Sequence, residues 1–398
     1  MKKEVAQKDL YGIVDEVAKG RISRRQFMER GLAMGLSVSA VGQVLVACGT
    51  KDDAVSGASP APMDETKPKQ VNLWNWADYM DGATKKNFEK ATGIKVVESY
   101  FDDNEALLTK LRAGGNAGGY DVMVPSDYMV HVLIMSGLIE PLNMEYIPNF
   151  SGVSKQMQNP KYDNPESPEN NGNRYSVPYA WGTTGYAQRI DILTDDCTKW
   201  ADLWNPAFEG KISMLNDERE TLGVGLMKNG YSINTQNIDE LNKAKEDLIA
   251  QVPLVRMYES VSPKSNIVKG IPLTHCWCGD IVLALWSGAV TTKTVNFVMA
   301  EEGMPVFTDC LVIPKKPGSS YGAHMFMNYL LDPKVQAPLQ SWIGYFTPVP
   351  AAVDQIDPVV YTFAPTEEKL AEPTTEGYED LGEFAIEYSN AWEEVRSV

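Results

Sequence analysis

The chain has 398 residues and a formal net charge of −17 at neutral pH, from 36 Lys and Arg against 53 Asp and Glu, with 3 His. This length accommodates two or three packed units, and a hydrophobic share of 43% with an aromatic share of 10% excludes wholesale disorder. The charge argues against nucleic-acid binding, which depends on Lys and Arg, and five Cys are too few for a disulfide scaffold.

The first segment has the pattern of an export signal. Eight lysines and arginines lie within the first 30 residues, residues 31–47 carry no charge, and small apolar residues end this stretch just before Cys48. A positive segment, a short apolar segment and a small-residue cleavage site predict export, because the apolar part is too short for a comfortable membrane span. The alternative is an N-terminal membrane anchor helix.

Two short motifs refine this prediction. Residues 23–27 (SRRQF) resemble a twin-arginine export motif. Residues 45–48 (LVAC) resemble a bacterial lipobox, which implies removal of residues 1–47 and a lipid on the sulfur of Cys48. The following residues 49–70 are rich in Gly, Pro, Ser and charge, so we expect Cys48 and a flexible tether to hold an exported body at the outer face of the cell membrane or in the periplasm.

The body begins with a run of alternating strands and helices. Gly93 is a plausible helix stop, and Ser126 is placed as a helix N-cap. Such a run predicts a parallel sheet covered on both faces. The strands are expected at 71–76, 95–101 and 120–124, and the helices at 84–92, 104–113 and 128–136.

A second run of the same kind follows. It predicts a second α/β lobe, with a ligand cleft between the two. The strands are expected at 211–215, 272–277 and 306–313. The helices are expected at 200–204, 220–229, 238–251, from Asp280, and at 321–331, 333–342 and 384–395.

Two acidic motifs lie at helix starts. Asp217 and Glu220 fit an N-cap with a partner at the third helical position, a structural reading that competes with a pocket role. Asp280 follows Trp277 at a strand-to-helix junction, where pocket residues concentrate in open α/β sheets. Its structural reading is a helix N-cap, with Trp277 in the core.

The cysteines and histidines give little support for metal. Cys276 and Cys278 are too close for the usual zinc spacing, and no second ligand pair follows, so we expect no metal and no cofactor. After removal of the signal, the cysteines at 197, 276, 278 and 310 could pair in an oxidising compartment, with a connectivity that the sequence does not give.

Aromatic residues near strand ends are followed closely by carboxylates. Each aromatic alone is more often core than a ligand platform. A flexible aliphatic chain with ammonium groups needs both types, since aromatic faces cover methylenes and attract cations, while carboxylates form charge-assisted hydrogen bonds. The pairs are Trp76 with Asp78, Trp277 with Asp280, and Phe307 with Asp309.

Catalytic patterns are absent from the sequence. There is no G-x-S-x-G elbow, no Walker A loop and no H-E-x-x-H motif. The three histidines show no paired nucleophile pattern. We therefore expect a binding protein and not an enzyme.

From residue 71 to nearly the C-terminus, the chain closely resembles the polyamine-binding proteins of bacterial ABC transporters, the spermidine/putrescine receptor family. Several ordered motifs over some three hundred residues carry this resemblance. They are NWADY (75–79), TGIKV (92–96), YDVMVPS (120–126), VPYAWGTT (177–184), WADLW (200–204), NDERE (216–220), WCGD (277–280) and IGYFTP (343–348).

The resemblance implies a type II periplasmic-binding-protein fold, an α/β fold of two lobes that are each a mostly parallel sheet flanked by helices, with the ligand cleft between them. It places one lobe at 71–183 and 308–355, and the other at 184–307 and 356–398. It implies aromatic contacts from Trp76, Tyr79, Tyr128, Trp277, Phe307 and Tyr345, with Ser126 beside the first-lobe aromatic wall, and ammonium partners at Asp217, Glu220, Asp280 and Asp309. Phe307 stands where the spermidine type has Trp, and a late Gln of the family falls near Tyr378 and Glu379 with a gap.

The function implied is a receptor that captures a polyamine cation and delivers it to an ABC permease as a monomer, anchored through Cys48. Two alternatives remain open. The same module could feed a signalling protein, or the chain could be an extracellular hydrolase. Neither the preferred polyamine nor the permease follows from the sequence.

Overall fold

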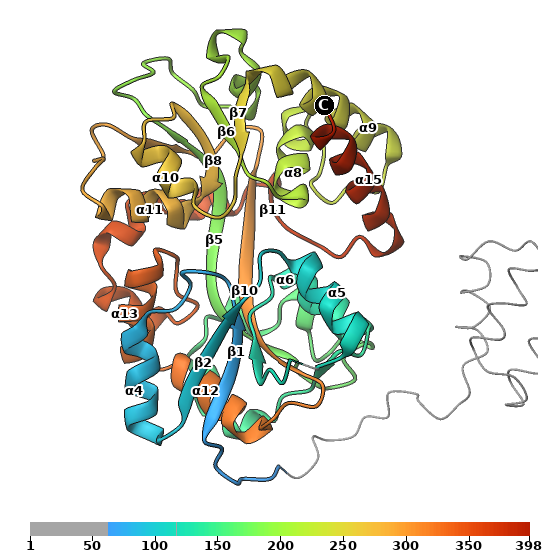
Figure 1. Cartoon of the computed structure of the whole chain (residues 1–398), viewed down its shortest axis with the longest axis vertical. Coiled ribbons are helices and arrows are strands. Elements are labelled where there is room, and N and C mark those ends of the chain that lie inside the picture. The colour runs from blue at the N-terminus through green and yellow to red at the C-terminus, as the bar shows by residue number, and fades with distance from the viewer. Residues whose placement is uncertain (1–62, 117) are drawn as a thin grey trace, which may run out of the picture. The chain divides into compact units, whose positions relative to one another are not determined.

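The computed structural model describes residues 63–116 and 118–398, and the predicted export signal and Cys48 lie outside these residues. Within them, strands form a sheet in the order β2-β1-β3-β10-β5-β8-β6-β7, with β4 and β11 paired to β10 and β9 paired to β5. Figure 1 shows β1 and β2 in one part of the molecule and β6, β7 and β8 in the other. The order shows that early strands gather at one end of the sheet and later strands at the other. Two long strands, β5 and β10, join the two ends.

The first lobe contains the first predicted run. Strand β1 (Gln70–Asn75) pairs in parallel with β2 (Lys95–Tyr100) and with β3 (Val122–Met123), as predicted. Helices α4 (Gly82–Thr92), α5 (Asn104–Gly114) and α6 (Asp127–Met135) follow these strands in turn.

The helix ends of this lobe agree with the sequence signals. Gly93 ends α4 in the left-handed conformation, with φ of 72°, where a side chain would be strained. Ser126 has the extended backbone of the α6 N-cap, but its side chain makes no capping bond to the helix.

Strands β5 (Ser176–Gln188) and β10 (Met304–Pro314) cross between the lobes and pair antiparallel, from Val306 opposite Thr183 to Val312 opposite Ser176. The pairing shifts register between Asp309 and Cys310. Part of β10 was expected from the sequence, but β5 was not, because β5 is buried along almost its whole length and so shows no alternating pattern.

The second lobe is built on the far ends of these strands. Strand β8 pairs with β5 and β6, β6 pairs with β7 in parallel, and β9 pairs with β5. Its strands are β6 (Ile212–Met214), β7 (Val255–Tyr258), β8 (Leu273–Trp277), β9 (Asn296–Val298) and β11 (Thr375–Gly377). Its helices are α8 (Glu218–Lys228), α9 (Ile238–Gln251), α10 (Pro263–Val268), α11 (Cys278–Trp286) and α15 (Ala385–Arg396).

The remaining elements are a short strand and four helices, with 3₁₀ turns between them. They are β4 (Ile139–Glu140), α7 (Lys155–Gln158), α12 (Ser320–Leu330), α13 (Pro333–Ile343) and α14 (Glu367–Leu370). The segment Trp200–Trp204, predicted to be helical, is a 3₁₀ helix. None of the helices in the described part of the chain is both long and apolar enough to span a membrane.

Candidate functional site

Glu220 lies in the first turn of α8 and is buried. Its Oε1 accepts hydrogen bonds from Trp277 Nε1 at 2.8 Å and Thr184 Oγ1 at 3.1 Å, and its Oε2 accepts one from the Tyr378 hydroxyl at 2.6 Å. Asp217 is the N-cap of α8 and accepts the Glu220 N–H at 3.0 Å, as the capping reading predicted. Asp217 therefore caps the helix, while the Glu220 carboxylate turns away from the cap and lies in a buried polar cluster.

Both of these carboxylates lie where ionisation is costly. Burial, with Asp217 adding repulsion, raises the pKa of Glu220 to about 7 despite three hydrogen bonds that lower it. Burial also raises the pKa of Asp217, against the hydrogen bonds from the α8 backbone. An added cation here would stabilise the ionised forms.

Asp309 lies on β10 at the register shift and faces the first lobe. Its Oδ2 accepts a hydrogen bond from the Tyr79 hydroxyl at 2.6 Å, and its Oδ1 accepts one from Ser126 Oγ at 2.8 Å. This explains why the Ser126 side chain does not cap α6. Burial raises the pKa of Asp309 to about 6, although both hydroxyls favour its ionised form.

Asp280 does not occupy the position expected from the sequence. Helix α11 begins at Cys278 with Trp277 as the N-cap, so Asp280 is the third helical residue and its N-cap assignment was wrong. Its Oδ2 accepts the Trp277 N–H and its Oδ1 accepts the Lys264 N–H, both at 3.3 Å. The extended backbone at the N-cap Trp277 allows the bond from its N–H back to Asp280. Burial raises the pKa of Asp280 to about 7.

Tyr345 joins the aromatic residues of the two lobes. Its ring makes edge-to-face contacts with Tyr79, at 5.4 Å between centroids, and with Phe307, at 5.9 Å. Two glycines leave the room that this ring needs. A Cβ on Gly279 would lie 2.4 Å from the Tyr345 ring, and one on Gly182 would lie 2.7 Å from Phe307 and 3.0 Å from Tyr345.

Trp76 and Tyr128 are held by bonds at their polar ends. Trp76 Nε1 donates to the Val124 carbonyl at 2.8 Å, and its ring packs 4.4 Å from Phe101. The Tyr128 hydroxyl donates to Glu105 Oε1 at 2.9 Å. The structure thus brings most predicted site residues into one network, with Trp76 and Tyr128 at its margin.

Besides Thr184, this network has three members that were not predicted as ligand contacts from the sequence. Tyr378 is bonded to Glu220 and lies 6.2 Å from the ring of Tyr128, so it connects the lobes. The Arg219 guanidinium lies 5.2 Å from each of those two rings. Burial, followed by repulsion from Asp217 and Glu218, raises the pKa of Glu105 to about 7. Only the gapped similarity near Tyr378 gave any signal for these residues.

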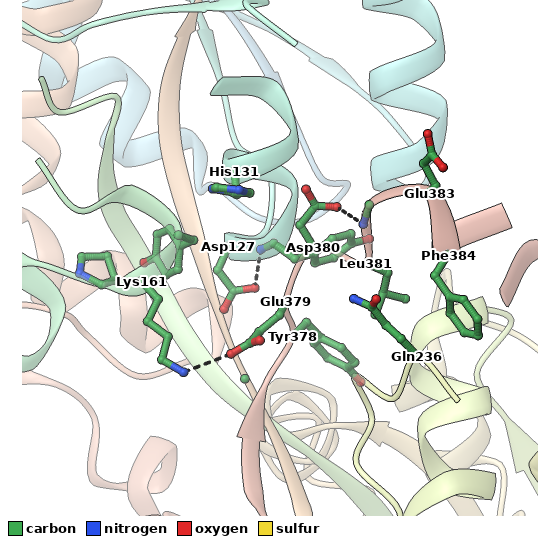
Figure 2. Close-up of a pocket in the computed structure, with 15 residues that line it drawn as sticks. Asp127, His131, Lys161, Gln236, Tyr378, Glu379, Asp380, Leu381, Glu383 and Phe384 are labelled. Carbon is green, nitrogen blue, oxygen red and sulfur yellow. Dashed lines mark hydrogen bonds and ion pairs between the residues drawn. The ribbon is translucent and has the colours of Figure 1, made fainter. Parts of the chain in front are cut away.

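A cavity of about 920 Å³ adjoins this network and shares Tyr128 and Tyr378 with it (Figure 2). It is lined by Tyr128, Tyr162 and His131 from one lobe, and by Gln236 and residues 377–384 from the other. Tyr128 is the only predicted ligand contact among its lining residues. The Glu379 carboxylate pairs with Lys161 at 3.2 Å across the cavity, at an exposed position.

Other chemistry has little support in the described part of the chain. Cys197, Cys276, Cys278 and Cys310 are buried free thiols, so the pairing left open by the sequence does not occur among them. No cluster of three or more potential metal ligands is found in residues 63–116 and 118–398. The network offers buried carboxylates with mostly neutral hydrogen-bond donors and aromatic faces, which suits a cationic ligand.

The comparisons with known proteins agree with this geometry. The family model "Bacterial extracellular solute-binding protein" matches residues 83–366. The chain is 30% identical over 372 residues to spermidine/putrescine-binding periplasmic protein 1 of Haemophilus influenzae, covering 91% of this chain and 98% of that protein. It is 32% identical over 306 residues to the spermidine/putrescine-binding periplasmic protein of Escherichia coli, covering 76% and 84%.

A solved structure, the TpPotD lipoprotein of Treponema pallidum, superposes with a TM-score of 0.71 at 25% identity and covers 83% of this chain and all of that one. The chain therefore belongs to the bacterial extracellular solute-binding proteins. This confirms the two-lobed binding-protein fold and the family resemblance that the sequence motifs indicated.

Proposed function

We propose that this protein is the receptor of an ABC importer that captures polyamines, putrescine or spermidine, between its lobes and delivers them to a membrane permease. The two periplasmic relatives described above are named as spermidine/putrescine-binding proteins. One observation supports the proposal most strongly: Glu220 of the second lobe and Asp309 beside the first are buried carboxylates whose side-chain partners are all neutral donors. A cation would supply the counter-charge that both carboxylates lack among these partners.

We assign the ligand contacts as follows. One ammonium group would pair with Glu220 and Asp217, and another with Asp309. The indole of Trp277 would cover the methylene chain, since its ring nitrogen bonds Glu220 while its backbone bonds Asp280. The apolar wall of the cleft would be completed by Trp76, Tyr79, Phe307 and Tyr345. Ser126 would orient Asp309, and Tyr128 would line the edge of the first lobe.

Closure follows from this distribution of charge. In an open state, water solvates the carboxylates of each lobe separately. A polyamine that contacts carboxylates of both lobes favours the closed state by its differential contacts. Closure also excludes water, so each ammonium–carboxylate contact strengthens, from about 1 kcal/mol at 4 Å in water toward about 4 kcal/mol near a protein surface, before desolvation is subtracted. The closed form would then dock on the permease.

The carboxylates of the network are tied to hydrogen-bond donors, so we infer binding without turnover. A titration with putrescine, cadaverine, spermidine and spermine tests this, followed by mass analysis of the released ligand. We expect saturable binding and unchanged ligand. Altered ligand would support a hydrolase, and transfer to a signalling protein instead of a permease would support a sensor.

Affinity should depend on pH through the buried carboxylates. A bound ammonium favours the ionised forms of Glu220, with a pKa of about 7, and of Asp309, with a pKa of about 6. Below these values, protons compete with the ligand, so the dissociation constant should rise at least about tenfold from pH 8 to pH 5. Calorimetry at four pH values measures this, and an unchanged constant would contradict the assignment.

The folding stability of the empty protein should depend on pH in the opposite sense to its ligand affinity. These carboxylates bind protons more tightly in the folded than in the unfolded chain, so stability should fall as pH rises from about 4 to about 7. Added polyamine should restore it at pH 8. Thermal denaturation with and without ligand separates the two effects.

Anchoring rests on Cys48 and can be tested separately. We propose that Cys48 carries the lipid and that residues 1–47 are removed. Cys48→Ser should release the body from the membrane fraction into the soluble fraction, measured by fractionation and immunoblotting. If the variant stays membrane-bound at its unprocessed length, an uncleaved anchor helix is present instead.

A further inference from the structure

One cation of the protein lies at an end of the proposed cleft. Lys264, the second residue of α10 in the second lobe, places Nζ 3.5 Å from Asp78 Oδ2 in the first lobe. The Lys264 side chain is 34% exposed and that of Asp78 is 76% exposed. An ion pair this exposed contributes little to closure, because water screens both charges. The more important effect of Lys264 is the effect of its positive charge on the buried carboxylate beside it.

Lys264 is also tied to a carboxylate of the cleft. Its backbone N–H donates to Asp280 Oδ1 at 3.3 Å, and its positive charge favours the ionised form of Asp280. Asp309 and Glu220 differ, because their side-chain partners are the neutral groups of Tyr79, Ser126, Trp277, Thr184 and Tyr378. The three carboxylates are thus unequal in their partners: Asp280 contacts a lysine, whereas the side-chain donors to Glu220 and Asp309 in the described part of the chain are all uncharged.

We propose that Lys264 is a specificity-determining residue that limits how many ammonium groups the cleft accepts. This inference rests on the proposed function. By supplying the positive charge at the Asp78–Asp280 end, Lys264 leaves two carboxylate positions, Glu220 and Asp309, for the ligand. A third ammonium directed to that end would meet the charge of Lys264, so the cleft favours a diamine over a triamine.

The test is Lys264→Gln, titrated with putrescine and spermidine. Removing the cation should raise the ratio of spermidine to putrescine affinity by about tenfold, equivalent to about 1.4 kcal/mol. Lys264→Arg keeps the charge and should keep the wild-type ratio. Lys161→Gln is the matched control, since it removes a second inter-lobe ion pair of the described residues, with Glu379, at the exposed rim of the Figure 2 cavity. It should leave the ratio unchanged.

Three results would overturn the inference. The ratio in Lys264→Gln could stay within about twofold of the wild type, both affinities could fall together as expected for a simple closure contact, or Lys161→Gln could shift the ratio equally. A wild-type protein that binds neither polyamine would instead refute the proposed function, so the two failures are distinguishable. Thermal denaturation of each variant shows that the fold is intact, as expected for a partly exposed side chain.

Discussion

Asp309→Asn is expected to weaken polyamine binding by at least about a hundredfold. Losing one partner of a buried ion pair typically costs about 3–5 kcal/mol, against about 0–1 kcal/mol for an exposed pair. The substitution suits this site because both partners of Asp309 are hydroxyls, Tyr79 and Ser126, and the Ser126 hydroxyl can turn to accept from the new amide. Shape and hydrogen bonding are kept while the charge is lost. Calorimetric titration with putrescine measures the effect.

Asp280→Asn is less suitable for isolating charge. Both Asp280 oxygens accept backbone N–H groups, so an amide nitrogen would meet a donor and destabilise the start of α11.

Asp380→Asn is the control for Asp309→Asn. It removes a carboxylate at the Figure 2 cavity and should change affinity less than about twofold. If Asp380→Asn abolished binding and Asp309→Asn did not, the ligand site would be that cavity.

Trp277→Ala should weaken binding by about 2–3 kcal/mol, or roughly 30–150-fold. It removes the apolar cover of the methylene chain and the attraction of the indole face for a cation. It also removes the Nε1–H bond to Glu220, which leaves that carboxylate less well oriented. Calorimetry is preferable to a tryptophan-fluorescence titration for this measurement, because the substitution itself removes a tryptophan.

The control for Trp277 is Trp286→Ala, at the last residue of α11. Trp286 is 41% exposed, so its loss should affect neither the polyamine dissociation constant nor the fold appreciably. If Trp277→Ala unfolded the protein without a specific binding defect in the folded fraction, the indole would be a core residue and its assignment to the cleft would be wrong.

Local signals in the sequence were sufficient for much of the fold. The β1-to-α6 run could be predicted because its strands are short and rich in apolar, β-branched or aromatic residues and its helices have a recognisable stop or cap, such as Gly93. Helix α9 was predicted with its observed bounds, Ile238–Gln251. Asp217 and Glu220 were placed correctly on α8 because capping is a local interaction.

The remaining features depend on long-range packing. The inter-lobe strand β5 is buried on both faces and contains Pro178 and two glycines, so its sequence has no strand periodicity. Tyr378 reaches Glu220 across 158 positions of sequence, and no local pattern could connect them. Asp280 looked like an N-cap because a capping carboxylate and a third-position carboxylate differ only by where the helix begins.

The lobe boundaries and the ligand contacts remain predictions, and a crystal structure of the protein with putrescine tests the central claim most directly. The account predicts one ammonium within about 2.9 Å of a Glu220 oxygen, the other at a similar distance from Asp309, and the methylenes along the Trp277 indole. Putrescine in the Figure 2 cavity, or in the cleft with neither carboxylate contacted, would contradict it.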